Sequence, residues 1–393
     1  MTDPSAFASK AKEWVNTGEL PGLQYLIAEG GSVIASECLG HQDLEQRQPV
    51  NSNTLYRLAS ATKIFVSIGF LRLVQNGVLK LDDPVSEVLP EYKNLTVLNA
   101  DGAPQAAQQT MRMVDLLRHT CGYGYGNQGA FRDALLGAGL LGVDDLGYDH
   151  WLTTLNLRDW AAALAQLPME EEPGTRVSYG LGHDLAGAVI EAATGTQLDD
   201  FMIQEVFTPL GLENTFFVVP EIRQADLSAF YTQQDGKAVS VETAKQSEFL
   251  HRPLAFSGGG GWDMLGNGGL VSNTQDFTTL LEMIVNNGVH DGHEFLSSQH
   301  AALLSHSQSS MLPYKDMLPG CEYSYGVAEV IDPERYQSKG TGSSGPKGKM
   351  WWGGSTNTYF FYVPEKKRVG VMLTNTFPFG HRGAVFKFGQ LSA

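Results

Sequence analysis

One stretch constrains the fold of this chain more than any other: the largely apolar run of residues 64–74, which Ser60 and Lys63 precede. A run of this length that ends at a glycine, Gly77, is typical of a helix buried inside a globular protein. Ser60 and Lys63 are three positions apart, so they lie on one face of such a helix. The stretch therefore predicts a buried helix that begins with a hydroxyl and an amine side by side.

This pair has two interpretations. The S-x-x-K spacing also occurs at residues 9–12, in a polar segment, and at residues 344–347, in a glycine-rich loop, so the spacing alone is weak evidence. In the first interpretation Ser60 is a nucleophile at the positive end of the helix dipole, and desolvated Lys63 serves as its base. In the second, Ser60 is an N-cap and Lys63 is a first-turn residue whose ammonium group reaches solvent.

Composition excludes several classes of partner. The 393 residues are 42% hydrophobic and 18% charged, which is ordinary for a soluble globular protein larger than one small core. The formal net charge of −16 opposes binding to nucleic acid or to an anionic membrane surface. No segment approaches the length of a membrane-spanning apolar run. Three widely separated cysteines and an N-terminus without an apolar core predict free thiols, no signal peptide and a cytoplasmic location.

The two ends of the chain mix strands with helices, whereas the middle is mainly helical. Near the N-terminus the pattern predicts a helix at 5–17, a β-hairpin of residues 23–28 and 32–36, and a short strand at 55–58. Toward the C-terminus it predicts four antiparallel strands and a closing helix, at 324–331, 350–352, 359–363, 369–374 and 382–388. Further helices are predicted at 114–119, 157–167, 180–193, 199–207 and 274–287, and the glycine-rich residues 122–147 are predicted to be a loop.

These patterns predict an α+β fold with a central antiparallel sheet flanked by helices. Residues 1–78 and 175–393 would share that sheet, and residues 79–174 would form an inserted, mostly helical subdomain. No composition shift marks an independent domain or a linker.

Further motifs follow the pair at 60–63 along the chain. Tyr179-Gly180-Leu181 opens a second apolar helix, and Trp352-Gly353-Gly354 lies on a predicted strand. The blocks LLRHTCG, at residues 116–122, and GGLVSNTQD, at residues 268–276, complete the series. Five blocks in this order resemble the serine β-lactamase and penicillin-binding-protein superfamily, and especially its class C β-lactamases and family VIII carboxylesterases. The resemblance runs from about residue 20 to about residue 375.

The resemblance implies a β-lactamase-like fold and an acyl-enzyme mechanism that needs no cofactor. Ser60 would be the nucleophile, and Lys63 with Tyr179 would form its base, although which of the two carries the proton stays open. The oxyanion would be held by the backbone N–H groups of Ser60 and Ser355. The substrate would be bound by Trp352, Gly353, Gly354, Leu181, Tyr123, Tyr125 and Trp262.

Two departures from the motifs of β-lactamases favour an apolar substrate. The third motif of β-lactamases is K-T-G or similar, and its lysine helps to bind the substrate carboxylate; Trp352 stands there instead, as in family VIII esterases and lovastatin-type acyltransferases. Leu181 replaces the asparagine of the Y-x-N motif. Both changes suit an anionic β-lactam poorly. Tyr123, Tyr125 and Trp262 are aromatic residues able to line a pocket, but core packing would explain each of them equally well.

We therefore expect an enzyme that cleaves small-molecule carboxylic esters of small or medium acyl groups. The alternatives are an acyltransferase, an amidase, D-aminopeptidase or weak β-lactamase, and a sensor that is acylated without turnover. The residues at 290–294, HDGHE, fit a turn better than a metal site, and His183 with Asp184 fits a helix-surface or supporting pair. No G-x-S-x-G motif offers another esterase mechanism, and no glycine-rich run ends as a phosphate-binding loop does.

Overall fold

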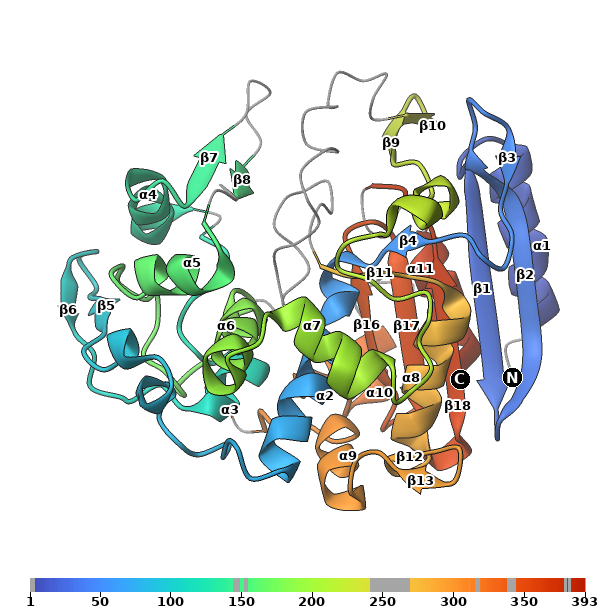
Figure 1. Cartoon of the computed structure of the whole chain (residues 1–393). Coiled ribbons are helices and arrows are strands. Elements are labelled where there is room, and N and C mark those ends of the chain that lie inside the picture. The colour runs from blue at the N-terminus through green and yellow to red at the C-terminus, as the bar shows by residue number, and fades with distance from the viewer. Residues whose placement is uncertain are drawn as a thin grey trace.

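A central antiparallel sheet of eight strands organises the computed structural model of this chain (Figure 1). The structure describes residues 4–126, 128–143, 149–151, 155–240, 269–310, 312–314, 319–337, 344–377, 380 and 383–392. The order of the strands across the sheet is β14-β15-β16-β17-β18-β1-β2-β3. They span Gly22–Glu29 (β1), Ser32–Asp43 (β2), Gln48–Pro49 (β3), Cys321–Tyr323 (β14), Ala328–Val330 (β15), Met350–Gly354 (β16), Thr358–Val363 (β17) and Arg368–Leu373 (β18).

Helices surround this sheet and extend beside it. The α-helices are Pro4–Asn16 (α1), Thr62–Gln75 (α2), Met113–Leu117 (α3), Gly129–Gly137 (α4), Leu157–Leu164 (α5), Gly182–Thr194 (α6), Leu198–Met202 (α7), Thr274–Val285 (α8), Ser298–Leu304 (α9), Pro333–Gln337 (α10) and Ala384–Gly389 (α11). Single turns of 3₁₀ helix include Ala59–Ala61 (η1), Val85–Glu87 (η2), Pro90–Tyr92 (η3), Glu221–Asp226 (η5), Pro364–Lys366 (η7) and Gln390–Ser392 (η9), and a π-helical turn at Ile203–Phe207 (η4) continues α7. None of the described helices is long and apolar enough to cross a membrane.

The sheet joins the two ends of the chain. β1 pairs with β18 in antiparallel register, with Gln24 opposite Leu373 and Glu29 opposite Arg368. The hairpin of β1 and β2 is therefore continuous with the C-terminal strands, as the sequence predicts, and the α+β fold class is confirmed.

Alternate residues of β1 enter two hydrophobic cores on opposite faces of the sheet, because successive side chains of a strand point to opposite sides. Leu26 and Ala28 belong to the larger core, which includes residues of α2 and α8. Tyr25 and Ile27 belong to the smaller core, which includes residues of α1 and α11. Burial on both faces explains why β1 reads as a nearly continuous apolar run.

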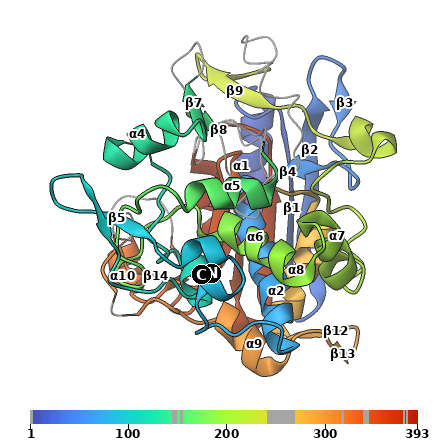
Figure 2. The same ribbon diagram turned by 60° about the vertical axis from the view of Figure 1, so that its left-hand side comes forward.

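The middle of the chain packs beside the sheet as a group of short helices and small hairpins (Figure 1 and Figure 2). Its hairpins pair Thr96–Leu98 (β5) with Pro104–Ala106 (β6) and Leu141–Val143 (β7) with Asp149–Trp151 (β8). The prediction of a loop throughout residues 122–147 is wrong, because α4 and β7 lie within that range. Phe131 and Leu135, one turn apart on α4, are buried in the larger core, and this burial stabilises a helix that glycines disfavour. The limits of the inserted subdomain stay a prediction.

Two strand predictions also need adjustment. The predicted strand at 324–331 is a turn followed by β15, since residues 324–327 connect β14 to β15. The predicted strand at 55–58 is reduced to Tyr56–Arg57 (β4), which pairs with Val271–Ser272 (β11). The remaining described hairpins pair Tyr231–Gln234 (β9) with Lys237–Ser240 (β10) and Val289–His290 (β12) with His293–Glu294 (β13).

The turn between β16 and β17 holds the segment that leads into α2. Thr356 Oγ1 donates a hydrogen bond to the carbonyl oxygen of Arg57 at 2.8 Å, and Thr358 Oγ1 donates one to that of Leu58 at 3.2 Å. Gly354 lies so close to this segment that a Cβ atom there would be 2.2 Å from the Leu58 oxygen and 3.1 Å from the Ala59 Cβ. The sheet therefore fixes the position of the first turn of α2.

A buried lysine connects the start of β16 to the C-terminal helix. Lys349 is fully buried, and its Nζ donates hydrogen bonds to the carbonyl oxygens of Gly389, at 2.7 Å, and Ser344, at 3.0 Å. Burial lowers the pKa of Lys349 from 10.5 to about 7, an effect that Cys321 partly opposes.

We expect Gly354→Ala to destabilise the protein, because the added methyl group must displace backbone atoms. Overpacking of this kind costs about 1–3 kcal/mol. Gly137→Ala is the matched control, since a Cβ at Gly137 meets no atom within 4 Å and this residue lies in α4. Denaturant unfolding of both variants tests this expectation, and equal stability of the two would contradict the tight packing of β16 against η1.

We also expect Lys349 to make stability rise with pH between about 7 and 10. In this range the unfolded chain binds a proton at Lys349 that the folded protein does not, so the free energy of unfolding increases by about 1.4 kcal/mol per pH unit from this group. Unfolding titrations at several pH values should show a smaller slope for Lys349→Met than for the exposed control Lys366→Met. Equal slopes would show that Lys349 is charged in the folded protein.

Candidate active site

Ser60 lies in the short 3₁₀ turn η1, which continues directly into α2. The turn begins at Ala59, whose φ of 47° is uncommon for a residue other than glycine. Ser60 is half-buried between the fully buried Ala59 and the buried Ala61. The N-cap position of α2 is Ala61, and no side chain caps the helix. The alternative that Ser60 is only an N-cap is therefore not supported.

Lys63 is fully buried among aromatic rings. Its Nζ donates a hydrogen bond to Tyr125 Oη at 3.0 Å and lies 4.8 Å from the centroid of the Tyr179 ring. The ring of Tyr125 is 5.7 Å from the same nitrogen. A side chain with no exposed surface does not reach solvent, so the second interpretation of Lys63 is wrong. The cation faces the negative faces of two rings, which partly replace its lost hydration.

Tyr179 joins the second and third motifs. Trp352 Nε1 donates a hydrogen bond to Tyr179 Oη at 3.1 Å, and the centroids of the two rings are 5.2 Å apart. Tyr125 lies on the other side, with its ring centroid 5.4 Å from that of Tyr179. Burial, followed by the neighbouring Tyr179, raises the pKa of the Tyr125 phenol well above its usual range. Tyr125 therefore stays a neutral phenol that is able to donate a hydrogen bond.

Close backbone contacts hold Tyr179 in place. A Cβ atom on Gly180 would lie 2.3 Å from the carbonyl oxygen of Tyr123, and one on Gly182 would lie 2.2 Å from that of Leu116. Each glycine therefore permits an approach that no other residue allows. The N–H of Leu181 donates to the Tyr123 oxygen at 3.1 Å. The N-terminus of α6 is thereby fixed against the segment that carries Tyr125.

The sequence did not reveal the part that His119 plays in this arrangement. Its Nδ1 accepts a hydrogen bond from the N–H of Gly180 at 3.2 Å, so Nε2 carries the proton and donates it to Tyr323 Oη at 3.1 Å. Burial, followed by the nearby His183 and Lys63, lowers the pKa of His119 well below its usual range. His119 is thus a neutral bridge. The place of His119 in the LLRHTCG block is a sequence signal for a role in the site. No local pattern identifies Tyr323 as its hydrogen-bond partner.

His183 supports the helix that carries Lys63. Its Nε2 lies 3.0 Å from Ser67 Oγ, one turn beyond Lys63 on α2. His183 is fully buried and Asp184 is 1% exposed, so the prediction of a helix-surface pair is wrong and the supporting role fits. Burial and the nearby Lys63 lower the pKa of His183 well below its usual range, which keeps its imidazole neutral.

The predicted oxyanion and third-motif residues lie at the end of β16. Gly353 and Gly354 are its last two residues, and Ser355 follows in the turn that packs against η1. Ser355 Oγ is buried and has no hydrogen-bond partner in the described part of the chain. The structure therefore brings the backbone of this turn next to the segment of Ser60.

Two of the predicted substrate-binding residues lie elsewhere. Tyr123 is fully buried, and its hydroxyl donates to the carbonyl oxygens of Leu164, at 3.3 Å, and Leu167, at 3.2 Å. Leu181 is also fully buried in the larger core. Tyr123 therefore packs against α5, and the side chains of both residues help to build the site without forming its surface. Trp262 lies outside the described residues.

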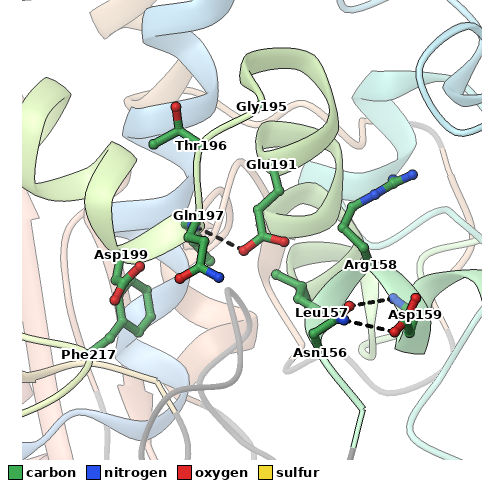
Figure 3. A pocket seen from close by; sticks show the side chains of 11 residues that line it. Asn156, Leu157, Arg158, Asp159, Glu191, Gly195, Thr196, Gln197, Asp199 and Phe217 are labelled. Atoms are coloured by element: carbon green, nitrogen blue, oxygen red, sulfur yellow. Dashed lines mark hydrogen bonds between the residues drawn. The ribbon is translucent and has the colours of Figure 1, made fainter.

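A separate pocket of about 490 Å³ opens near the far end of α6 (Figure 3). Its lining residues are Asn156, Leu157, Arg158, Asp159, Glu191, Gly195, Thr196, Gln197, Leu198, Asp199 and Phe217. Glu191 is nine residues along α6, roughly 14 Å from its start. Asn156 Oδ1 accepts from the N–H of Asp159 at 2.8 Å, and Glu191 Oε1 accepts from that of Leu198 at 2.9 Å. These polar groups already cap helices, which accounts for them without a ligand.

Residues 290–294 belong to the β12–β13 hairpin, and Asp291 and Gly292 form its turn, as their sequence predicts. Among the residues that the structure describes, no group of three or more His, Cys, Asp or Glu side chains is placed to hold a metal ion.

Comparisons with known proteins agree with this geometry. Residues 7–387 match the family described as Beta-lactamase. Esterase EstB from Burkholderia gladioli is 29% identical over 368 residues, which are 91% of this chain and 86% of the esterase. The acyltransferase calJ from Penicillium decumbens is 25% identical and covers 89% of this chain and 83% of its own.

Two solved structures have the same fold. EstCE1, a hydrolase with promiscuous acyltransferase activity, superposes with a TM-score of 0.76 at 23% identity and covers 98% of both chains. Simvastatin synthase (LovD) from Aspergillus terreus gives a TM-score of 0.77 at 19% identity, over 99% of this chain and 98% of the synthase. The predicted β-lactamase-like fold is therefore confirmed. Because the family match spans nearly the whole chain, this protein belongs to the beta-lactamase family.

Proposed function

We propose that this protein hydrolyses carboxylic esters of small or medium acyl groups through an acyl-enzyme on Ser60. The observation that carries the proposal is the cluster beside η1, where buried Lys63 bonds Tyr125 and faces the ring of Tyr179. A nucleophile at the start of a helix, with an amine one turn on and two phenols packed against that amine, is suited to acyl transfer.

In the proposed reaction Ser60 Oγ attacks the carbonyl carbon of the ester while its proton passes to the Lys63–Tyr179 pair. The oxyanion accepts hydrogen bonds from the backbone N–H groups of Ser60 and Ser355. The bond to the alcohol oxygen then breaks, and the alcohol takes up the proton from the same pair. Water attacks the acyl-serine in the same way, which releases the carboxylic acid and restores Ser60.

The third motif supports a neutral substrate. Trp352 stands where a lysine would balance a substrate carboxylate, and its indole N–H already bonds Tyr179. A β-lactam or peptide also needs polar partners around its amide, and each missing partner costs about 1–3 kcal/mol. The relatives named as esterases, EstB and EstCE1, favour the same substrate class.

Acyl transfer to an alcohol or amine is the second candidate. It differs from hydrolysis only in the nucleophile that attacks the acyl-serine, and the similar proteins calJ, an acyltransferase, and EstCE1, a hydrolase with promiscuous acyltransferase activity, are named for such transfer. The same acyl-enzyme on Ser60 would serve both reactions.

We expect Ser60→Ala to abolish ester cleavage and to leave folding intact. Removal of the nucleophile of an acyl-enzyme mechanism typically costs several decades in kcat. Ser344→Ala is the matched control, because Ser344 has the same S-x-x-K spacing and only its carbonyl oxygen bonds Lys349. A serine-reactive phosphonate, mapped by mass spectrometry, should label Ser60; a label on another serine would refute the assignment.

We further expect p-nitrophenyl butyrate to be cleaved with a kcat/KM several decades above that for nitrocefin. Each polar contact to a β-lactam that this site lacks, such as the lysine contact replaced at Trp352, costs about one to two decades. Steady-state kinetics on one preparation test this. Similar efficiencies would favour a β-lactamase or amidase instead, and an alkyl ester product formed when butanol is added would favour the acyltransferase.

A further inference from the structure

We infer that Trp352 is a positioning residue that acts on Tyr179, whose phenolic oxygen it holds as a hydrogen-bond acceptor, and that its N–H does not bind substrate. The inference rests on the proposed function, in which the Lys63–Tyr179 pair receives the proton of Ser60. It changes the role of Trp352 from the substrate contact that the sequence predicts to a residue that tunes the base.

The direction of the hydrogen bond carries the inference. An indole N–H is only a donor, so the oxygen of Tyr179 is the acceptor in the 3.1 Å contact with Trp352 Nε1. The indole is held by neighbours on the sheet: Trp352 lies opposite Phe360 on β17 and packs edge-on against Tyr323, with ring centroids 5.1 Å apart. A donor this well fixed, with its single N–H already engaged, has none to offer to a substrate.

Other groups around Tyr179 act in the same sense. The ring of Tyr125, which keeps its own proton, packs against Tyr179 with centroids 5.4 Å apart. The ammonium group of Lys63 lies 4.8 Å from the Tyr179 ring. Hydrogen bonds to the ionised form of a group, together with a nearby opposite charge, stabilise that form. The donor on Trp352 and the nearby amine of Lys63 therefore favour Tyr179 as the group that accepts the proton of Ser60.

Four of the titratable neighbours stay neutral near pH 7. The groups that face Tyr179 or its partners are Lys63 on α2, Tyr125, His119 beyond α3, His183 and Asp184 on α6, and Tyr323 on β14. Burial lowers the pKa of His119 and His183 and raises the pKa of Tyr125 and Tyr323, each well beyond its usual range.

The third motif then has a clear chemical meaning. A lysine at position 352 would offer both a hydrogen-bond donor to Tyr179 and a positive charge to an anionic substrate. The indole keeps the donor and removes the charge. The site can therefore retain an activated tyrosine while it loses attraction for carboxylates.

The test is the pH profile of kcat/KM for p-nitrophenyl butyrate in Trp352→Phe, which keeps a ring but loses the N–H. We expect the acid limb to move up by about 1–2 pH units, because a hydrogen bond to a charged group is lost. We expect kcat at pH 7 to fall at least tenfold and KM to change less than threefold. Trp351→Phe is the matched control: Trp351 packs beside Trp352, with ring centroids 5.7 Å apart, but the hydrogen bond to Tyr179 comes from Trp352, so this replacement should leave the profile in place.

A raised KM with an unmoved pH profile would show that Trp352 binds substrate and would overturn the inference. Benzothienylalanine at position 352, which keeps the bicyclic shape and removes only the N–H, provides the second variant if phenylalanine impairs folding.

A readout that needs no turnover is the ¹³Cζ signal of labelled Tyr179, identified by its loss in Tyr179→Phe. We expect its titration midpoint to rise in both Trp352 variants. An unchanged midpoint refutes the inference even if ester cleavage is found, whereas an inactive wild-type protein refutes only the proposed function.

Discussion

The antiparallel pairing of β1 with β18 is the interaction on which the rest of the structure depends. It joins the two ends of the chain, and the hydrogen-bonded pair of Glu29 and Arg368 at its margin is separated by 339 positions in the sequence. Once β18 is fixed, β17 and β16 follow it by antiparallel pairing, and their connecting turn reaches the segment before α2. The hydroxyls of Thr356 and Thr358 then bind the carbonyl oxygens of that segment, so the sheet fixes the position of Ser60.

The site built on this frame must tolerate a buried cation. Complete burial of Lys63 removes the hydration of its ammonium group, a cost that only hydrogen bonds and nearby negative potential can offset. The Tyr125 oxygen and the faces of two tyrosine rings supply part of this compensation. A phenol can also exchange a proton with its neighbour. The groups that make Lys63 tolerable inside the protein are therefore the groups that suit it to proton transfer.

Strong periodicity made parts of this fold predictable from the sequence. The helix expected at 5–17 is Pro4–Asn16, and the strand expected at 359–363 is Thr358–Val363, because each buries a regular pattern of apolar residues. The hairpins β5–β6 and β7–β8 were missed because strands of three residues carry no such pattern. Their formation depends on neighbours that are distant in the sequence.

The order of the motifs of the candidate site can be predicted from the sequence, but their surroundings cannot. Tyr123 and Tyr125 are two positions apart, and the sequence predicts that both line the same substrate pocket. The structure directs the first to the backbone of α5 and the second to Lys63. What separates them is the path of the chain at Gly124, which pairs with Gly180 in an isolated bridge. That contact lies 56 positions away in the sequence, and no local pattern specifies the direction in which either ring points.

The position of Trp352 shows how specificity can change without loss of the nucleophile. The contacts that fix the turn of Ser60 come from Gly354, Thr356 and Thr358, and they involve backbone atoms and small side chains. Trp352 lies on β16 with Gly354 but contributes to none of these contacts, since its N–H bonds Tyr179. A substitution at position 352 therefore alters the charge of the site and the environment of Tyr179. The contacts that fix the turn of Ser60 are kept. One strand thus carries two separable functions, and this separation allows a single fold to serve substrates of different charge.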